Sequence, residues 1–151
     1  MPRSVDLLDA NVWLALAAAA HAHHDRARVF WSDEAADVVA FCRMTQLAFL
    51  RRLTNKTIMG EHCLTPRAAW TKCSQFLALP EVQLLQEPPG LTEQLARYCD
   101  LGRTSPSLWT DAYLAAFAKC AGLRLVSFDR GFRAFGGLEV LTLDPPPPKT
   151  S

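Results

Sequence analysis

The chain has 151 residues, half of them hydrophobic, and a formal net charge of +1 at pH 7. This size and composition suit one globular domain with a substantial core, and the near-neutral charge excludes a basic field over the whole molecule while allowing a local basic patch. The five cysteines are odd in number and form no C-x-x-C motif. A disulfide framework or a zinc site is therefore not expected, and a reducing cytoplasm is favoured.

An apolar run at residues 12–20 resembles the core of a signal peptide. However, Asp6, Asp9 and Asn11 precede this run. The run is also much shorter than the ~20 residues that a membrane-spanning helix needs. We therefore expect neither a cleaved signal nor a membrane anchor.

Strand-like and helix-like segments alternate along the chain. Short, apolar strand candidates lie at residues 4–8, 37–42, 81–87, 123–129 and 138–143. Helical patterns lie between them at 11–20, 21–35 (after a loop), 45–60, 65–79, 88–102 and 105–122. This alternation predicts an α/β fold, in which a parallel sheet of four to five strands is flanked by helices. We expect one domain at residues 1–144 and a disordered, proline-rich tail at 145–151.

Several helix ends have recognisable signals. Thr65 followed by Pro66 is typical of an N-cap and a first helical residue. Gly60 stands where a glycine often ends a helix, so the segment 45–60 is expected to be one continuous helix.

Three aspartates are expected at one edge of this sheet. Asp9 follows the first strand, Asp129 follows the fourth, and Asp111 lies in the first turns of the helix at 105–122. Ligands of open parallel sheets bind beyond the carboxyl ends of the strands. Two like charges about 4 Å apart repel by about 4 kcal/mol at an effective dielectric of 20. A hard divalent cation, Mg²⁺ or Mn²⁺, is the natural counterion, and it can orient a phosphate and activate water.

Each acid also has a plainer interpretation. Asp9 alone is typical of a helix N-cap, Asp111 alone of a favourable charge near a helix N-terminus, and Asp129 alone of a turn. The joint placement of the three at one edge is what indicates a site.

Four segments resemble, in order and spacing, the successive motifs of PIN-domain ribonucleases, and most of all those of the VapC toxins of bacterial toxin–antitoxin pairs. They read LLDANVWLAL, TQLAFLRRLTN, WTDAYLAAFA and LVSFDRGF. The resemblance extends from Val5 to about Leu143. It implies a PIN fold, metal-dependent cleavage of RNA, a homodimer, and neutralisation by a VapB-type antitoxin.

On this resemblance, Asp9, Asp111 and Asp129 match the catalytic, metal-binding acids of the family. Asn11 matches a polar residue two positions after the first acid, and Ser127 matches a small hydroxyl residue two positions before the last acid. The last two are expected to support the site through hydrogen bonds.

One position departs from the family pattern. Most PIN nucleases have a glutamate at the start of the helix that follows the second strand, and here the best match is Gln46. Glutamine keeps an oxygen but lacks the charge, so weaker metal binding and one metal ion rather than two are expected. If Gln46 does not face the ion, Glu34 and Asp37 are the next residues to consider.

Other polar and aromatic residues leave two interpretations open. Arg43, Arg51 and Arg52 suit phosphate contact or a solvated helix face equally well. The H-x-H-H histidines are poorly spaced for one tight metal site and are expected to contact solvent or a partner. The four tryptophans are expected in the core or at an interface rather than as base-stacking platforms. These residues are His21, His23, His24, Trp13, Trp31, Trp70 and Trp109.

The sequence therefore predicts a Mg²⁺- or Mn²⁺-dependent endoribonuclease that acts as the toxin of a type II toxin–antitoxin pair. One alternative is a catalytically weakened RNA- or protein-binding module on the same fold, which Gln46 suggests. Another is a phosphotransfer hydrolase with Asp9 as its nucleophile, which Asn11 disfavours because that chemistry usually needs a second acid there. Metal-dependent cleavage would separate the first alternative from the prediction, and a covalent phospho-aspartate would support the second.

Overall fold

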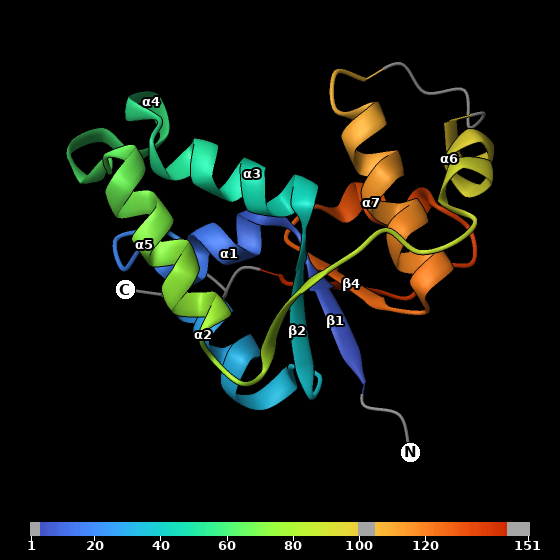
Figure 1. Cartoon of the computed structure of the whole chain (residues 1–151), viewed down its shortest axis with the longest axis horizontal. Helices are drawn as coiled ribbons and strands as arrows, with labels where there is room; N and C mark the ends of the chain where they lie inside the picture. The colour runs from blue at the N-terminus through green and yellow to red at the C-terminus, as the bar shows by residue number, and fades with distance from the viewer. Residues whose placement is uncertain (1–3, 100–104, 145–151) are drawn as a thin grey trace, which may run out of the picture.

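The central sheet has five parallel strands (Figure 1). The structure is a computed structural model that describes residues 4–99 and 105–144, so the predicted tail at 145–151 lies outside it. The strands are β1 (Val5–Leu8), β2 (Val38–Cys42), β3 (Val82–Leu85), β4 (Arg124–Ser127) and β5 (Val140–Thr142). Their order is β3-β2-β1-β4-β5, which confirms the predicted α/β class.

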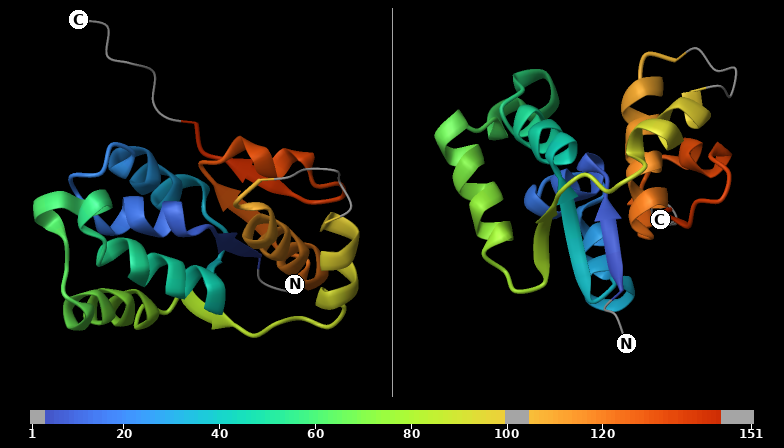
Figure 2. Two further views of the ribbon diagram at one scale, coloured as in Figure 1. Left: turned by 90° about the horizontal axis from the view of Figure 1, so that it is seen from above. Right: turned by 45° about the vertical axis from the view of Figure 1, so that its right-hand side comes forward.

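The helices cover both faces of the sheet (Figures 1 and 2). One group is α1 (Ala10–Ala17), α2 (His24–Val29), α3 (Arg43–Leu53), α4 (Lys56–Met59) and α5 (Pro66–Leu77), and the other is α6 (Leu91–Cys99) and α7 (Leu108–Ala121). Three short irregular helices complete the described chain: a π-helix at Phe30–Glu34 and 3₁₀ helices at Gly60–His62 and Arg130–Ala134. None of the helices in these residues has the length and hydrophobicity needed to cross a bilayer.

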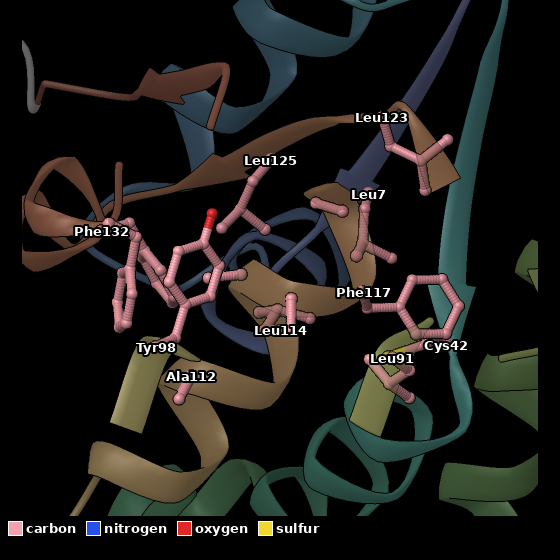
Figure 3. Packing of buried hydrophobic residues seen from close by; sticks show 14 residues of the cluster. Leu7, Cys42, Leu91, Tyr98, Ala112, Leu114, Phe117, Leu123, Leu125 and Phe132 are labelled. Carbon is pink, nitrogen blue, oxygen red and sulfur yellow. The ribbon is translucent and has the colours of Figure 1, made fainter. Parts of the chain in front are cut away.

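Each face of the sheet has its own hydrophobic core. Successive side chains of a strand point to opposite faces. Leu7 and Leu125 therefore pack beneath α6 and α7 with Phe117 and Tyr98 (Figure 3). Their sequence neighbours, including Leu8, pack beneath α1, α3 and α5. Because both faces are covered, the central strands are mostly apolar, with Asp6, Arg124 and Ser127 as the polar residues of β1 and β4. This composition is why the strands were recognisable in the sequence.

The tryptophans divide between core and surface. Trp13 is fully buried and stacks on Phe41, with ring centroids 3.8 Å apart. Trp70 and Trp109 are 55% and 64% exposed, so of the two expected positions, core or interface, only an interface is left for them.

The predicted single helix at 45–60 is two helices. The Thr54 hydroxyl donates to the Leu50 carbonyl, and the Asn55 side chain accepts from the backbone N–H groups of Thr57 and Ile58. Side chains of this kind offer the backbone an alternative to helical hydrogen bonds. Asn55 therefore ends α3 and caps α4, while Gly60 follows α4 with a positive φ of 56°.

An ion pair with a buried carboxylate lies near the amino-terminal ends of the central strands β1 and β4. Asp6 is fully buried, and the Arg124 guanidinium donates to its two carboxylate oxygens at 2.7 and 2.8 Å. The Ala36 backbone N–H also donates to Asp6, at 2.9 Å. Asp6 therefore has a structural contact at the start of β1, away from Asp9 at its end.

Candidate functional site

A cleft of about 400 Å³ lies at the carboxyl ends of the central strands, between α3 and α7. The chain runs from β1 outward to β2 on one side and later returns to place β4 on the other side of β1. Ligand sites of open parallel sheets form at such a reversal of strand order. The polar residues that line the cleft are Asp9, Asn11, Thr45, Arg51, Arg52, Asn55, Ser107, Thr110, Asp111 and Asp129. The three predicted acids thus line one cleft.

Asp9 joins the end of β1 to the start of α1. Its Oδ1 accepts from the Ala10 backbone N–H at 2.7 Å, as an N-cap does, and its Oδ2 accepts from the Ser127 hydroxyl at 2.7 Å. The Asp9 backbone N–H donates to the Val126 carbonyl, which continues the ladder between β1 and β4. Asp9 is therefore an N-cap and a wall of the cleft at once.

The buried Ser127 hydroxyl is the centre of a hydrogen-bond network. It donates to Asp9 and accepts from the Asn11 side-chain amide at 3.3 Å and from the Asp129 backbone N–H at 2.9 Å. A hydroxyl has one proton and two lone pairs, so its capacity is fully used. The Asn11 side-chain oxygen accepts in turn from the Phe128 backbone N–H at 3.4 Å. The network fixes the loop after β4 against the end of β1.

The two other acids have different settings. Asp129 is exposed, and its Oδ1 accepts from the Gly131 backbone N–H at 2.8 Å at the start of the 3₁₀ turn. Asp111 is half-buried in the first turn of α7, where a helix favours negative charge. Ser107, Thr110 and Asp111 turn the same side of α7 toward the cleft.

The wall formed by α3 differs from the expectation. Thr45, Ala48, Arg52 and Asn55 line the cleft at helical spacing, whereas Gln46 does not. Gln46 precedes Ala48 by two residues, which places it about 200° around the helix. Its buried amide accepts from the Arg43 guanidinium and donates to Cys73 Sγ on α5 at 3.8 Å. The structure thus brings Ala48, not Gln46, to the cleft.

Arg51 and Arg52 line the cleft, whereas Arg43 does not. The three cleft carboxylates therefore face two guanidinium groups. Among the arginines considered from the sequence, these two are positioned for phosphate contact at this site.

The remaining candidates are engaged elsewhere. Glu34 forms an ion pair with Arg26 at 2.9 Å, and Asp37 accepts from Ser4 near the start of β1 and β2. His23 stacks on Phe128, with ring centroids 4.8 Å apart, and His24 Nδ1 lies 2.7 Å from the Ala15 carbonyl oxygen. His21, His23 and His24 are all half-buried. The histidines therefore pack within the chain instead of extending into solvent.

Several residues of the cleft were not recognised in the sequence. Ala48, Asn55, Ser107 and Thr110 line it, and none belongs to a charged motif. They could have been found from their helical spacing to charged residues that were already candidates. Ala48 and Asn55 lie four before and three after Arg52, and Ser107 and Thr110 lie four before and one before Asp111.

Burial dominates the electrostatics of Asp9. It raises the pKa of the Asp9 carboxyl above the ordinary value of 3.8, and the negative charge of Asp129 acts in the same direction. The hydrogen bonds from Ser127 and Ala10 and the positive charge of Arg52 lower this pKa in part. The charged form of Asp9 is therefore less favourable here than in water, and its contacts offset only part of the effect of burial.

The donor set of the cleft suits a hard cation in its chemistry. All three acids offer carboxylate oxygens, and Mg²⁺ binds through one or two carboxylates while keeping several waters. Within residues 4–99 and 105–144, however, no three His, Cys, Asp or Glu side chains lie close enough together to form one compact metal site. The three acids therefore share the cleft without forming a compact three-acid site, so an ion there would complete its coordination with water.

Comparison with known proteins agrees with this architecture. The PIN domain family model matches residues 7–138. Ribonuclease VapC41 of Mycobacterium tuberculosis is 42% identical over 91% of this chain and 97% of its own length. Ribonuclease VapC37 of the same organism is 33% identical over 87% of this chain and 92% of its own length. The chain therefore belongs to the PIN-domain family, and VapC ribonucleases are among its homologues.

Solved structures share the fold. The crystal structure of VapC20 from Mycobacterium tuberculosis superposes with a TM-score of 0.64 and 24% identity, over 89% of this chain and 98% of that one. The structure of VapBC-1 from nontypeable Haemophilus influenzae gives a TM-score of 0.67 at 11% identity, over 92% and 98% of the two chains.

The raised pKa of Asp9 predicts how Asp9→Asn changes stability with pH. A carboxyl that binds its proton more tightly in the folded chain makes folding less favourable as the pH rises from its unfolded pKa through its folded pKa. Asp9→Asn also replaces one of two accepting oxygens by an NH2 group, a cost that does not change with pH. Without metal, the free energy of unfolding of the variant relative to the parent should therefore increase as the pH rises from 4 to 7. Urea unfolding at several pH values measures this difference, with Asp33→Asn on the surface as control. A difference that stays constant or falls over this range would contradict the account of Asp9.

Proposed function

We propose that this chain is a Mg²⁺- or Mn²⁺-dependent endoribonuclease that acts as the toxin of a toxin–antitoxin pair. The observation that carries the proposal is one cleft at the strand-order reversal that contains Asp9, Asp111 and Asp129 together with Arg51 and Arg52. Carboxylates suit a divalent ion, and guanidinium groups suit the phosphates of RNA. The naming of homologues as VapC ribonucleases supports the same activity.

Asp9, Asp111 and Asp129 would hold the ion, directly or through water. Ser127 and Asn11 hold Asp9 and Asp129 in place through hydrogen bonds. When bound, the ion supplies an activated water and neutralises charge on the phosphate.

The chain's own residues position the RNA. Arg51 and Arg52 bind the phosphate backbone and hold the phosphorus above the carboxylates. Water then attacks the phosphorus, the P–O bond to the leaving nucleoside breaks, and the proton passes to the leaving oxygen.

The proposed partners are RNA, a VapB-type antitoxin and a second copy of the chain. The likeness to a VapBC assembly such as VapBC-1 supports a toxin that pairs with an antitoxin. The homodimer rests on the family resemblance alone and stays a prediction.

The site bears differently on the two alternative functions, a phosphotransfer hydrolase and a weakened binding module. A phosphotransfer hydrolase would use Asp9 as its nucleophile, but Asn11 stands where that chemistry usually needs a second acid, and its amide donates to Ser127. A weakened binding module is the outcome to be tested, because the α3 wall presents Ala48 and arginines to the cleft without a carboxylate.

RNA cleavage by the purified chain tests the proposal. Cleavage of single-stranded RNA should require Mg²⁺ or Mn²⁺ and stop with EDTA, and Asp9→Asn should abolish it. Ser127→Ala should reduce it by about 10- to 100-fold, since loss of a supporting hydrogen bond typically costs this much. Asp33→Asn is the matched control. Undiminished cleavage in EDTA by repurified protein, or by a folded Asp9→Asn variant, would contradict the proposal.

A matched pair of variants tests the α3 wall. Ala48→Glu adds a carboxylate that faces the cleft, so it should tighten Mn²⁺ binding and increase the rise in melting temperature that Mn²⁺ causes, as expected for a ligand that binds the native state. Gln46→Glu adds the same charge where it contacts Cys73 and Arg43, so Mn²⁺ affinity should stay near that of the parent. Calorimetric titration and thermal melts with and without Mn²⁺ measure both. If Gln46→Glu tightens binding and Ala48→Glu does not, the motif alignment is right and the position given to Gln46 is wrong.

A further inference from the structure

A second cavity, of about 490 Å³, lies at the end of β3; it is called the edge pocket below. It is lined by Arg43, Leu84, Leu85, Glu87, Tyr113 and Phe117. Residues next to each other in sequence line the two cavities: Arg43 and Met44 on α3, and Tyr113 and Leu114 on α7. The chain that leaves β3 passes the start of α3 on its way to α6 (Figure 1). Helices α3 and α7 thus contribute to the walls of both cavities.

The edge pocket combines an apolar floor with a positioned carboxylate. Phe117 is fully buried, and Leu84 and Leu85 are half-buried. The Tyr113 hydroxyl donates to Glu87 Oε1 at 2.8 Å. Burial, and then this bond, raise the pKa of Tyr113, so the phenol remains a neutral donor. Tyr113 thus holds the Glu87 carboxylate in place.

The donor and acceptor pattern selects one kind of base. A carboxylate has about four acceptor positions, so the bond from Tyr113 leaves space for two further donors. Guanine presents two adjacent donors, N1–H and the N2 amino group, on its Watson–Crick edge. Adenine and cytosine each offer one amino group beside a ring nitrogen that accepts, and uracil offers one donor between two carbonyls, so none of the three presents two adjacent donors to a carboxylate.

A charge for the adjoining phosphate is also present. Arg43 is an exposed residue at the start of α3, and its guanidinium donates to Gln46. This contact holds a cation at the edge pocket. Proteins commonly bind single-stranded RNA by packing a base against apolar and aromatic side chains and by contacting a phosphate with a basic residue. The edge pocket offers both kinds of contact.

We propose that the edge pocket binds a guanine of the RNA substrate near the cleaved phosphate, with Glu87 accepting from N1–H and the N2 amino group. Tyr113 positions Glu87, Leu84 and Leu85 contact the base, and Arg43 contacts a flanking phosphate. The inference rests on the proposed ribonuclease function and adds its base preference.

Cleavage of matched oligoribonucleotides tests this inference. The probes are single-stranded RNAs in which guanine at each position is replaced in turn by inosine, which lacks the N2 amino group, or by adenine. The parent should prefer guanine at one fixed distance from the cut, by about tenfold or more over adenine, the range expected of a bidentate contact. Glu87→Gln should lose most of this preference and should respond little to inosine. Tyr113→Phe should reduce the preference, and Glu93→Gln on α6 is the control.

The outcomes separate the two proposals. Cleavage without any guanine preference, or an equal preference in the parent and in folded Glu87→Gln, would overturn the edge pocket and leave the ribonuclease intact. A Glu87→Gln variant that keeps the base preference but loses antitoxin binding would show a protein contact instead, and would overturn it too. If the parent cleaves none of the RNAs with Mn²⁺, the ribonuclease proposal itself fails.

Discussion

The hydrogen bonds of one buried hydroxyl tie the acidic edge of this sheet together. Ser127 ends β4 beside the end of β1, and its single proton goes to Asp9 while its lone pairs accept from Asn11 and from the Asp129 backbone. Because every position of the hydroxyl is used, the distance between the two strand ends and the direction of Asp9 are set by the fold itself. Any ligand of these acids therefore meets a site that is already arranged.

The burial of Asp9 and the nearness of a second carboxylate are electrostatically unfavourable, and a bound cation would reduce this free energy. Burial raises the pKa of Asp9, and Asp129 adds a second negative charge nearby. Arg52 offsets part of this charge from the α3 wall. The cleft thus differs from a purely acidic pocket, since the wall that faces the carboxylates presents arginines and Ala48. In the proposed ribonuclease, the arginines would increase the affinity for the RNA phosphates and decrease the affinity for the metal ion.

The parts that the sequence predicted well depend on local rules. The five strands were recognisable because strands covered on both faces are apolar, and the positions of Asp9 and Asp129 followed from the rule that sites form at the carboxyl ends of parallel strands. Their placement on one cleft with Asp111 required only the strand order. Their roles in catalysis remain a proposal.

The predictions that differ from the structure concern the phase of α3 and a side chain that competes with helical backbone hydrogen bonds. Motif matching chose Gln46, but the phase of α3 turns Ala48 to the cleft and leaves Gln46 against Cys73. The predicted helix at 45–60 ignored Asn55, whose side chain caps a new helix. The sequence left core and interface positions open for the tryptophans, and only the structure distinguishes buried Trp13 from exposed Trp109. The contact between Tyr113 and Glu87 joins residues on different elements, and no local pattern could have predicted it.

The position of a bound ion tests the central claim most directly. Crystals of the protein soaked with Mn²⁺ and measured at the manganese absorption edge should show an anomalous peak in the cleft, within reach, directly or through water, of carboxylate oxygens of Asp9 and Asp129, with the Ser127 hydroxyl still donating to Asp9. A peak at another position, or none at a Mn²⁺ concentration that supports RNA cleavage, would contradict the claim that these strand-end acids hold the catalytic metal.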